Sequence, residues 1–148
     1  MKIIGNIVLA GIMLGLVACG SNSNSGNING NWTAALMESS NASPVFDFTL
    51  SLTENSGGNL SVTNLNFTTA TPCFASGATA TGGFTLSGNM NGVTSGGFQM
   101  NIQSAESGGS NSMTLQGTVN NNTITGTWAL SGTTSGCSGS GNFTMNRG

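Results

Sequence analysis

The sequence predicts an all-β fold: eight antiparallel strands that run up and down in a meander and close into a barrel. Apolar residues alternate with polar ones over eight short segments, and Asn, Gly and Ser separate these segments. No stretch of the mature chain repeats its apolar residues every 3.6 positions, as an amphipathic helix would. Because an open sheet of eight strands leaves two unpaired edges, closure into a barrel is favoured.

The alternating apolar positions place each strand along the chain. In the third segment the alternation shifts by one residue after Val62, and an extra residue near Thr63-Asn64, a β-bulge, would absorb this shift. The strands carry, in order, Trp32, Ala34 and Leu36; Phe46, Phe48, Leu50 and Leu52; Leu60, Val62, Leu65 and Phe67; Phe84 and Leu86; Phe98, Met100 and Ile102; Met113 and Leu115; Ile124, Trp128 and Leu130; and Phe143 with Met145.

The connections between these strands fall into a short set and a longer set. The short ones are 55–58, 91–96 and 120–122, and the longer ones are 39–44, 69–80, 105–111 and 131–138. Alternate connections of a meander lie at the same end of the sheet. We therefore expect tight turns at one end of the barrel and longer loops at the other.

The N-terminus resembles an export signal. Lys2 precedes an apolar stretch, residues 3–17, that is shorter than the roughly 20 residues of a membrane-spanning helix. The stretch ends in Leu16-Val17-Ala18-Cys19, which resembles the lipobox of bacterial lipoproteins. The resemblance implies cleavage before Cys19 and attachment of lipid to its thiol, so that the membrane is a partner. The alternative is an ordinary secretory signal followed by a chance cysteine.

The resemblance divides the chain into three parts: a signal peptide at 1–18, a lipidated cysteine and flexible tether at 19–30, and a β-barrel domain at 31–148. The tether is rich in Gly, Ser and Asn. Gly20, rather than the aspartate that retains enteric lipoproteins in the inner membrane, follows the cysteine. We therefore expect a cell-envelope location, with the outer membrane favoured.

Two cysteines remain if Cys19 is lipidated. Cys73 and Cys137 both fall in the longer set of connections, and an exported chain meets an oxidising compartment. A disulfide between them would close a loop of about 64 residues and contribute about 4 kcal/mol in the chain-entropy account. Two free thiols are the alternative. A zinc site is not expected, because two cysteines without histidine cannot supply four ligands.

Composition argues against most active chemistries. After removal of the signal, Arg147 is the single basic side chain and stands against Glu38, Asp47, Glu54 and Glu106, a side-chain charge of −3. Such a chain cannot neutralise phosphates, so no nucleic-acid partner is expected. Histidine, the commonest general base, is absent. We expect neither a cofactor nor catalysis.

Gly30-Asn31-Trp32 at the start of the first strand is similar to the Gly-x-Trp signature of lipocalins. Lipocalins place a basic residue from the last strand against that tryptophan, and Arg147 has the matching position. The resemblance implies a lipocalin-like barrel and a floor pair of Trp32 with Arg147. The interior of an eight-stranded barrel has room either for side chains or for one small ligand, which would here be apolar. Residues 124–132 also resemble a strand of avidin-like barrels.

Three residues are candidates for the barrel mouth: Glu38, Phe74 and Glu106. Glu38 and Glu106 project toward the longer-loop end, where they could act as the acid and base of a hydrolase; solvated loop charges are the favoured interpretation. Phe74 either caps the mouth or packs under its loop. Ligand entry is expected at this end.

Gly88, Gly117 and Gly126 interrupt the inward face. They either leave room for a ligand or let the strands bend, and bending is favoured.

The outer faces suggest another function: contact with glycan or cell wall. Thr and Ser are also ordinary residues of solvent-facing strands, and this simpler interpretation is favoured. The outer-face residues are Thr49, Ser51, Ser61, Thr85, Gln99, Asn101, Gln103, Thr114, Gln116, Thr125 and Thr127.

Lipidation gives the first testable prediction. Mass spectrometry of the exported protein should show a mature N-terminus at Cys19 carrying diacyl or triacyl lipid. The Cys19→Ala variant should lose the lipid and leave the membrane fraction. An unmodified Cys19 in the mature protein would contradict the lipobox assignment.

Overall fold

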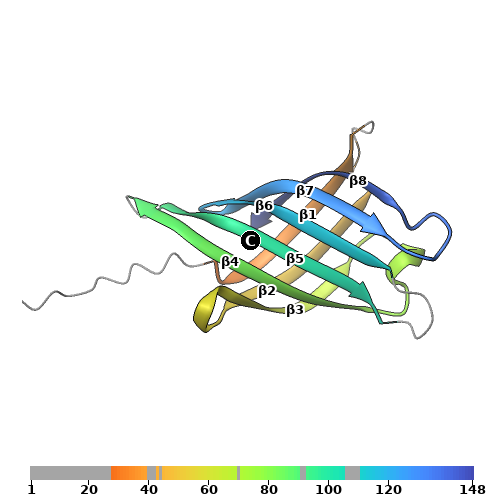
Figure 1. Cartoon of the computed structure of the whole chain (residues 1–148), viewed down its shortest axis with the longest axis horizontal. Coiled ribbons are helices and arrows are strands. Elements are labelled where there is room, and N and C mark those ends of the chain that lie inside the picture. Colours follow the sequence, from red (N-terminus) through yellow and green to blue (C-terminus); the bar gives the residue numbers. More distant parts are fainter. Residues whose placement is uncertain (1–27, 40–42, 44, 70, 91–92, 106–110) are drawn as a thin grey trace, which may run out of the picture.

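The computed structural model describes residues 28–39, 43, 45–69, 71–90, 93–105 and 111–148. Its eight strands form a closed barrel in which each strand pairs antiparallel with the next and β1 pairs with β8 (Figure 1). This confirms the all-β meander, and the lipocalin-like architecture is compatible with it. The strands are β1 (Gly30–Glu38), β2 (Phe46–Glu54), β3 (Asn59–Phe67), β4 (Ala78–Met90), β5 (Val93–Ser104), β6 (Ser112–Asn120), β7 (Thr123–Ser131) and β8 (Gly139–Arg147).

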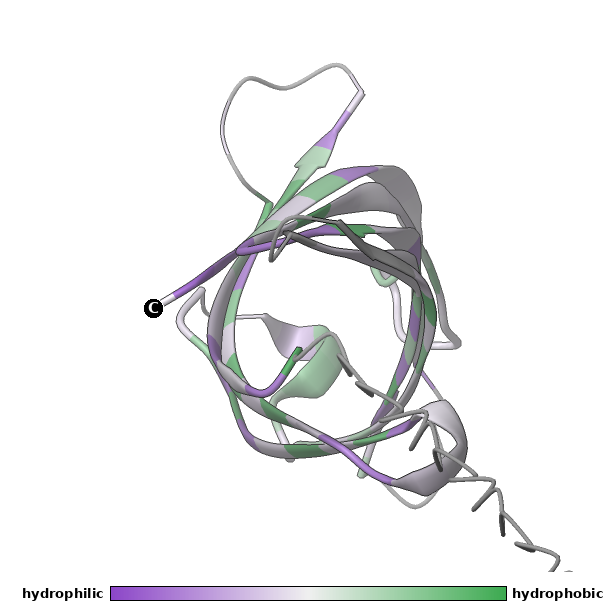
Figure 2. Cartoon of the chain, turned by 90° about the vertical axis from the view of Figure 1, so that its left-hand side faces the viewer, coloured by the Kyte–Doolittle hydropathy of each residue, from purple (hydrophilic) through white to green (hydrophobic). Residues whose placement is uncertain are grey.

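Two short 3₁₀ helices lie in the connections, one at each end of the barrel: η1 (Ser56–Gly58) and η2 (Pro72–Phe74). Figure 1 shows η1 with the tight turns on the left and η2 with the longer loops on the right. We call these the turn end and the loop end. Seen from the turn end, the strands form a ring and η2 lies across the far opening (Figure 2).

The lipobox and Cys19 lie outside the described residues. Within the described part of the chain, no helix is long and apolar enough to cross a membrane.

The barrel interior is filled with apolar side chains. One face of each strand is buried, as the period of two requires, and the largest side chains on that face are almost inaccessible to solvent. The most deeply buried of them are Trp32, Phe48, Leu36, Leu50, Leu52, Ile102, Met113, Leu115, Ile124, Met145 and Val119. The opposite face carries the predicted Thr, Ser, Asn and Gln residues, exposed or half-buried.

The folded domain begins earlier than expected, because the last residues of the predicted tether are packed into the barrel. Ile28 is 0 % exposed, and its carbonyl oxygen accepts a 3.0 Å hydrogen bond from Nε1 of Trp32. Gly30 pairs with Leu52 across the β1–β2 ladder. The boundary at residue 31 was therefore late by at least three residues, since a single isoleucine gave too weak a signal of burial.

The floor at the turn end is the expected aromatic–cation pair. Trp32 and Arg147 are register partners on β1 and β8, and the guanidinium carbon lies 4.9 Å from the centre of the indole ring. Gly30 lies beside the side chain of Arg147 and has a φ of 139°, a backbone conformation that favours glycine. Desolvation by burial lowers the pKa of Arg147 below its ordinary value. A cation–π contact of this kind contributes about 0.5–2 kcal/mol.

The predicted β-bulge is present in β3. Thr49 pairs with Asn66 and Ser51 pairs with Thr63, so Leu50 alone stands opposite two residues of β3. Asn64, one of these two, has a positive φ of 53°. Asparagine tolerates this left-handed conformation better than most residues. The bulge restores the inward direction of Leu65 and Phe67, which pack against the core.

The β4–β5 hairpin is longer than the sequence suggested. The strands have 13 and 12 residues, and β5 begins at Val93, within the predicted turn at 91–96. Leu86 was expected to alternate with Phe84 on the apolar face but is 40 % exposed. The ladder between β3 and β4 ends at Gly83, so the distal part of β4 has β5 as its only partner strand among the described residues.

The inward glycines leave no room for a ligand where the structure describes their surroundings. Gly117 and Gly126 are register partners on β6 and β7. A Cβ added to Gly117 would lie 2.9 Å from Cζ of Phe143 and closer still to the carbonyl oxygen of Thr125. Phe143 therefore occupies the space beside Gly117, and main-chain atoms of Gln116 and Gly117 occupy the space beside Gly126. Gly88, the third candidate, pairs with Ser95.

This packing predicts that two glycine-to-alanine substitutions differ in their effect on the free energy of unfolding. Gly117→Ala should lower the free energy of unfolding by about 1–3 kcal/mol, because the added methyl group overlaps Phe143 and the β7 backbone. Gly97→Ala, on the outer face, has no atom within 4 Å of the new Cβ and should leave stability unchanged or raise it by up to about 1 kcal/mol. Urea unfolding measures both. Equal effects would show that Phe143 does not fill this space.

Candidate functional site

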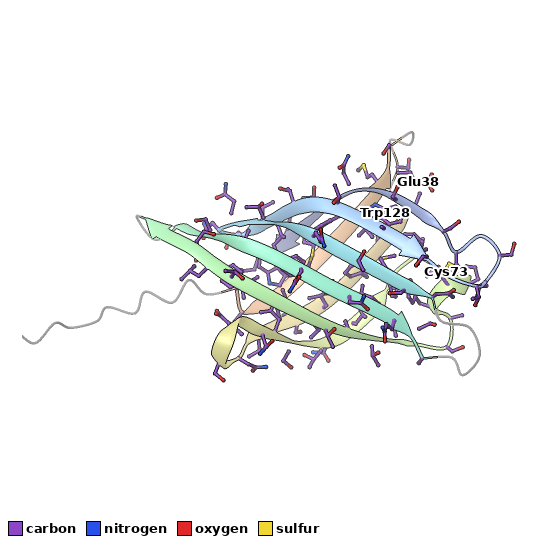
Figure 3. The ribbon with its side chains drawn as sticks, in the orientation of Figure 1. Glu38, Cys73 and Trp128 are labelled. Carbon is purple, nitrogen blue, oxygen red and sulfur yellow. A yellow bond between two sulfur atoms is a disulfide. The ribbon has the colours of Figure 1, made fainter. Side chains whose placement is uncertain are left out.

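The loop end is held together by the expected disulfide. Cys73 in η2 is bonded to Cys137 in the β7–β8 connection, with an S–S distance of 2.08 Å and Cα atoms 5.5 Å apart. Both cysteines are buried. Figure 3 shows Cys73 at the same end of the barrel as Glu38 and Trp128. The bridge therefore ties η2 to a loop on another part of the rim.

A buried asparagine ties a third loop to these two. Asn111 is the last residue of the β5–β6 connection and is 1 % exposed. Its Nδ2 donates to the carbonyl oxygen of Cys73 at 2.9 Å and to Oγ1 of Thr134 at 3.1 Å, and its Oδ1 accepts from the amide of Thr134 at 3.4 Å. The burial of Asn111 could not be predicted from the sequence, because nothing in the local pattern distinguishes it from the many exposed asparagines.

Phe74 closes the loop end from inside. It is 5 % exposed and stacks on Phe67, with ring centres 4.8 Å apart and an interplanar angle of 6°. Phe67 in turn meets the edge of Phe48, a core residue, with ring centres 5.3 Å apart. Phe74 thus both caps the mouth and packs under its loop. The end through which ligand entry was expected is filled by an aromatic column.

Beside this column, a groove opens in the barrel wall between β3 and the start of β4. We call it the lateral groove. It has a volume of about 610 Å³. It lies where β3 and β4 have separated, because their ladder contains only three pairs, from Asn59–Gly83 to Ser61–Thr81. The groove is lined by Leu65, Asn66, Phe67, Thr69, Thr71, Pro72, Phe74, Ala75, Gly77 and Ala78.

Of the three mouth candidates, the two that the structure describes, Glu38 and Phe74, are not brought together as one site. Glu38 is half-buried at the end of β1, and its carboxylate and the Trp128 ring both lie next to Gly139. Glu38 and Phe74 line different hollows. Glu106 lies outside the described residues.

The Trp128 side of the rim is closed by its own contacts. Nε1 of Trp128 donates a 3.0 Å hydrogen bond to the carbonyl oxygen of Met37. The rings of Phe46 and Trp128 are in edge-to-face contact, with their centres 5.6 Å apart. Trp128 is therefore used in packing the rim of the barrel.

Two hollows on the outer face share polar residues of β3, β5 and β6. One has a volume of about 380 Å³ and the other about 420 Å³. Asn59, Gln99 and Gln116 line both of them, and Gln99 and Gln116 are register partners. Gly83 and Gly97 line the second hollow, and because glycine has no side chain the main chain forms the surface there.

The described ionisable side chains are spread over both ends. Glu38 and Asp47 belong to strand ends at the loop end, whereas Glu54 and Arg147 belong to the turn end. In the described ranges, no three His, Cys, Asp or Glu side chains gather in a way that could hold a metal ion.

Compared with known protein families, with curated proteins and with solved structures, the chain matches none of them. The geometry alone therefore carries the functional argument.

Asn111 provides a test of how the loop end is held. Asn111→Ala should lower the free energy of unfolding by about 1–3 kcal/mol, because it leaves the buried Cys73 carbonyl and its other partners unsatisfied. Asn120→Ala removes an exposed asparagine at the far end of β6 and should change stability by less than about 0.5 kcal/mol. Thermal unfolding of the oxidised proteins compares them. Two equally small losses would contradict the role assigned to Asn111.

Proposed function

We propose that this protein is an exported, lipid-anchored, non-catalytic binding domain that holds an apolar group in the lateral groove. The observation that carries the proposal is the contrast between a filled barrel interior and an open groove with aromatic walls. A preformed, mostly apolar hollow with a few polar groups is typical of a binding site.

The binding site of this proposal differs from that of a lipocalin-like barrel. The core side chains occupy the axis, and the hollows lined by Phe74, by Gln99 and by Glu38 all open to solvent. In the lateral groove, Phe67 and Phe74 contribute apolar surface, and Thr69 and Thr71 are polar residues of the lining.

Lipid at Cys19 would attach the barrel at its turn end. The chain enters β1 at that end, at Gly30, and the lateral groove lies at the loop end. An anchored protein of this form holds the groove on the side of the barrel farthest from its attachment point. This position suits the capture of a ligand from the surrounding compartment.

The outer-face hollows favour a second candidate function, contact with a neutral glycan. Gln99, Gln116 and Asn59 provide amide donors and acceptors around a glycine-lined surface. Such uncharged hydrogen-bonding groups match sugar hydroxyls.

Binding of the neutral fluorophore N-phenyl-1-naphthylamine tests the first function. The probe is titrated into an unlipidated Cys19→Ser protein that is exported with a general secretory signal in place of residues 1–18. Ala75→Arg, which places a long charged side chain in the groove, should weaken binding at least about tenfold because it fills and polarises the apolar space. The matched Ala129→Arg variant, on the exposed face of β7, should bind like the parent.

Equal binding by both arginine variants would contradict a site in the lateral groove. If a neutral oligosaccharide stabilises the parent and Ala75→Arg against heat but does not stabilise Gln99→Ala, the outer-face function is favoured instead.

A further inference from the structure

The lateral groove exposes the main chain of a strand as well as apolar side chains. The ladder between β3 and β4 stops at Ser61, although β3 continues to Phe67. Over this last part, β3 is paired with β2 on one side and borders the groove on the other. It is therefore an edge strand within a closed barrel.

The direction of its hydrogen-bonding groups follows from the ladder with β2. The amide of Thr68 donates to the carbonyl oxygen of Asp47 at 2.8 Å, so Thr68 faces β2. Successive residues of a strand point their amide and carbonyl groups to opposite sides. Both main-chain groups of Phe67 therefore point away from β2. Among the described residues, no hydrogen bond to these two groups is found.

A free amide and a free carbonyl on one strand residue are the groups that an added antiparallel strand engages. In strand addition the main-chain bonds give affinity, and hollows for alternate side chains give specificity. Leu65, Phe67 and Phe74 provide an apolar wall next to this edge. The groove therefore matches an extended peptide in which every second residue is apolar.

The acidic side chains near the groove favour a partner that carries a basic residue. Thr69 lines the groove, and its hydroxyl donates to Oδ2 of Asp47 at 3.5 Å. Glu38, at the same end of the barrel, is also acidic, whereas Arg147 lies at the turn end. A basic residue of the partner next to Asp47 would thus be favoured electrostatically.

We propose that the lateral groove binds an extended peptide segment, which adds as a strand to β3 at Phe67, inserts alternate apolar side chains toward Leu65 and Phe74, and places a basic residue near Asp47. This inference rests on the proposed function, since it names the molecule that carries the apolar group.

Two synthetic peptides test strand addition. The first is acetyl-Lys-Val-Thr-Val-Thr-Val-amide, and the second has the same sequence with alternate amides N-methylated. Each peptide competes with N-phenyl-1-naphthylamine on the unlipidated Cys19→Ser protein. The first should displace the fluorophore, and the second should need at least about tenfold more peptide because it cannot donate the main-chain bonds. Equal displacement by both peptides, or by neither, would overturn strand addition.

Charge variants test the orientation of the peptide. Asp47→Asn should weaken binding of the first peptide about two- to fivefold and reduce the dependence of binding on salt. The matched Glu54→Gln variant, at the turn end, should leave binding unchanged. If both variants behave alike, the assigned orientation is wrong.

The outcomes separate the two proposals. If the fluorophore binds in the groove but no peptide competes, the groove function stands and strand addition fails. If the fluorophore does not bind in the groove, both fail. Dimerisation in sedimentation experiments, relieved by the first peptide and by Ala75→Arg, would show that a second copy of this chain is the occupant and would overturn the assignment.

Discussion

The β-bulge in β3 is the constraint on which the lateral groove depends. A bulge bends the strand that carries it and increases its local twist. Here the extra residue at Asn64 lies just beyond Ser61, the last residue of β3 that pairs with β4. The two strands then diverge while the rest of the barrel stays closed. Without the extra residue, Leu65 and Phe67 would turn to the solvent face, because a shift of one residue exchanges the faces of a strand.

The loop end stabilises the opening that the bulge creates. The disulfide and Asn111 hold η2 against two other loops, so that Phe74 is fixed on Phe67 and covers the end of the core. The barrel can therefore keep an apolar interior and still present an open strand edge. Local order at the groove comes from these cross-loop bonds rather than from a β3–β4 ladder.

The barrel architecture could be predicted from the sequence because apolar and polar residues alternate regularly along each strand. Alternation identified the strands, the shift after Val62 located the bulge, and the loop lengths placed Cys73 and Cys137 at one end. The groove could not be predicted, since the alternation located the bulge between β2 and β3 but did not show whether the β3–β4 ladder continues past it. Asn111 was missed for a similar reason: its burial arises from three loops meeting in space. Gly117 illustrates an ambiguous signal, because an inward glycine can accompany either an empty space or a ring from another strand.

Amide hydrogen exchange measured by NMR shows whether β3 has an open edge at Phe67. In the free monomer, the Phe67 amide should exchange within about tenfold of the rate of an unfolded peptide, because it faces the groove and has no hydrogen-bond partner among the described residues. The amide of Asn66, which faces β2, should exchange at least about a hundredfold more slowly than that of Phe67. Equal, strong protection of the Phe67 and Asn66 amides would show that the edge of β3 is already paired in the free protein, which leaves no open edge for a peptide.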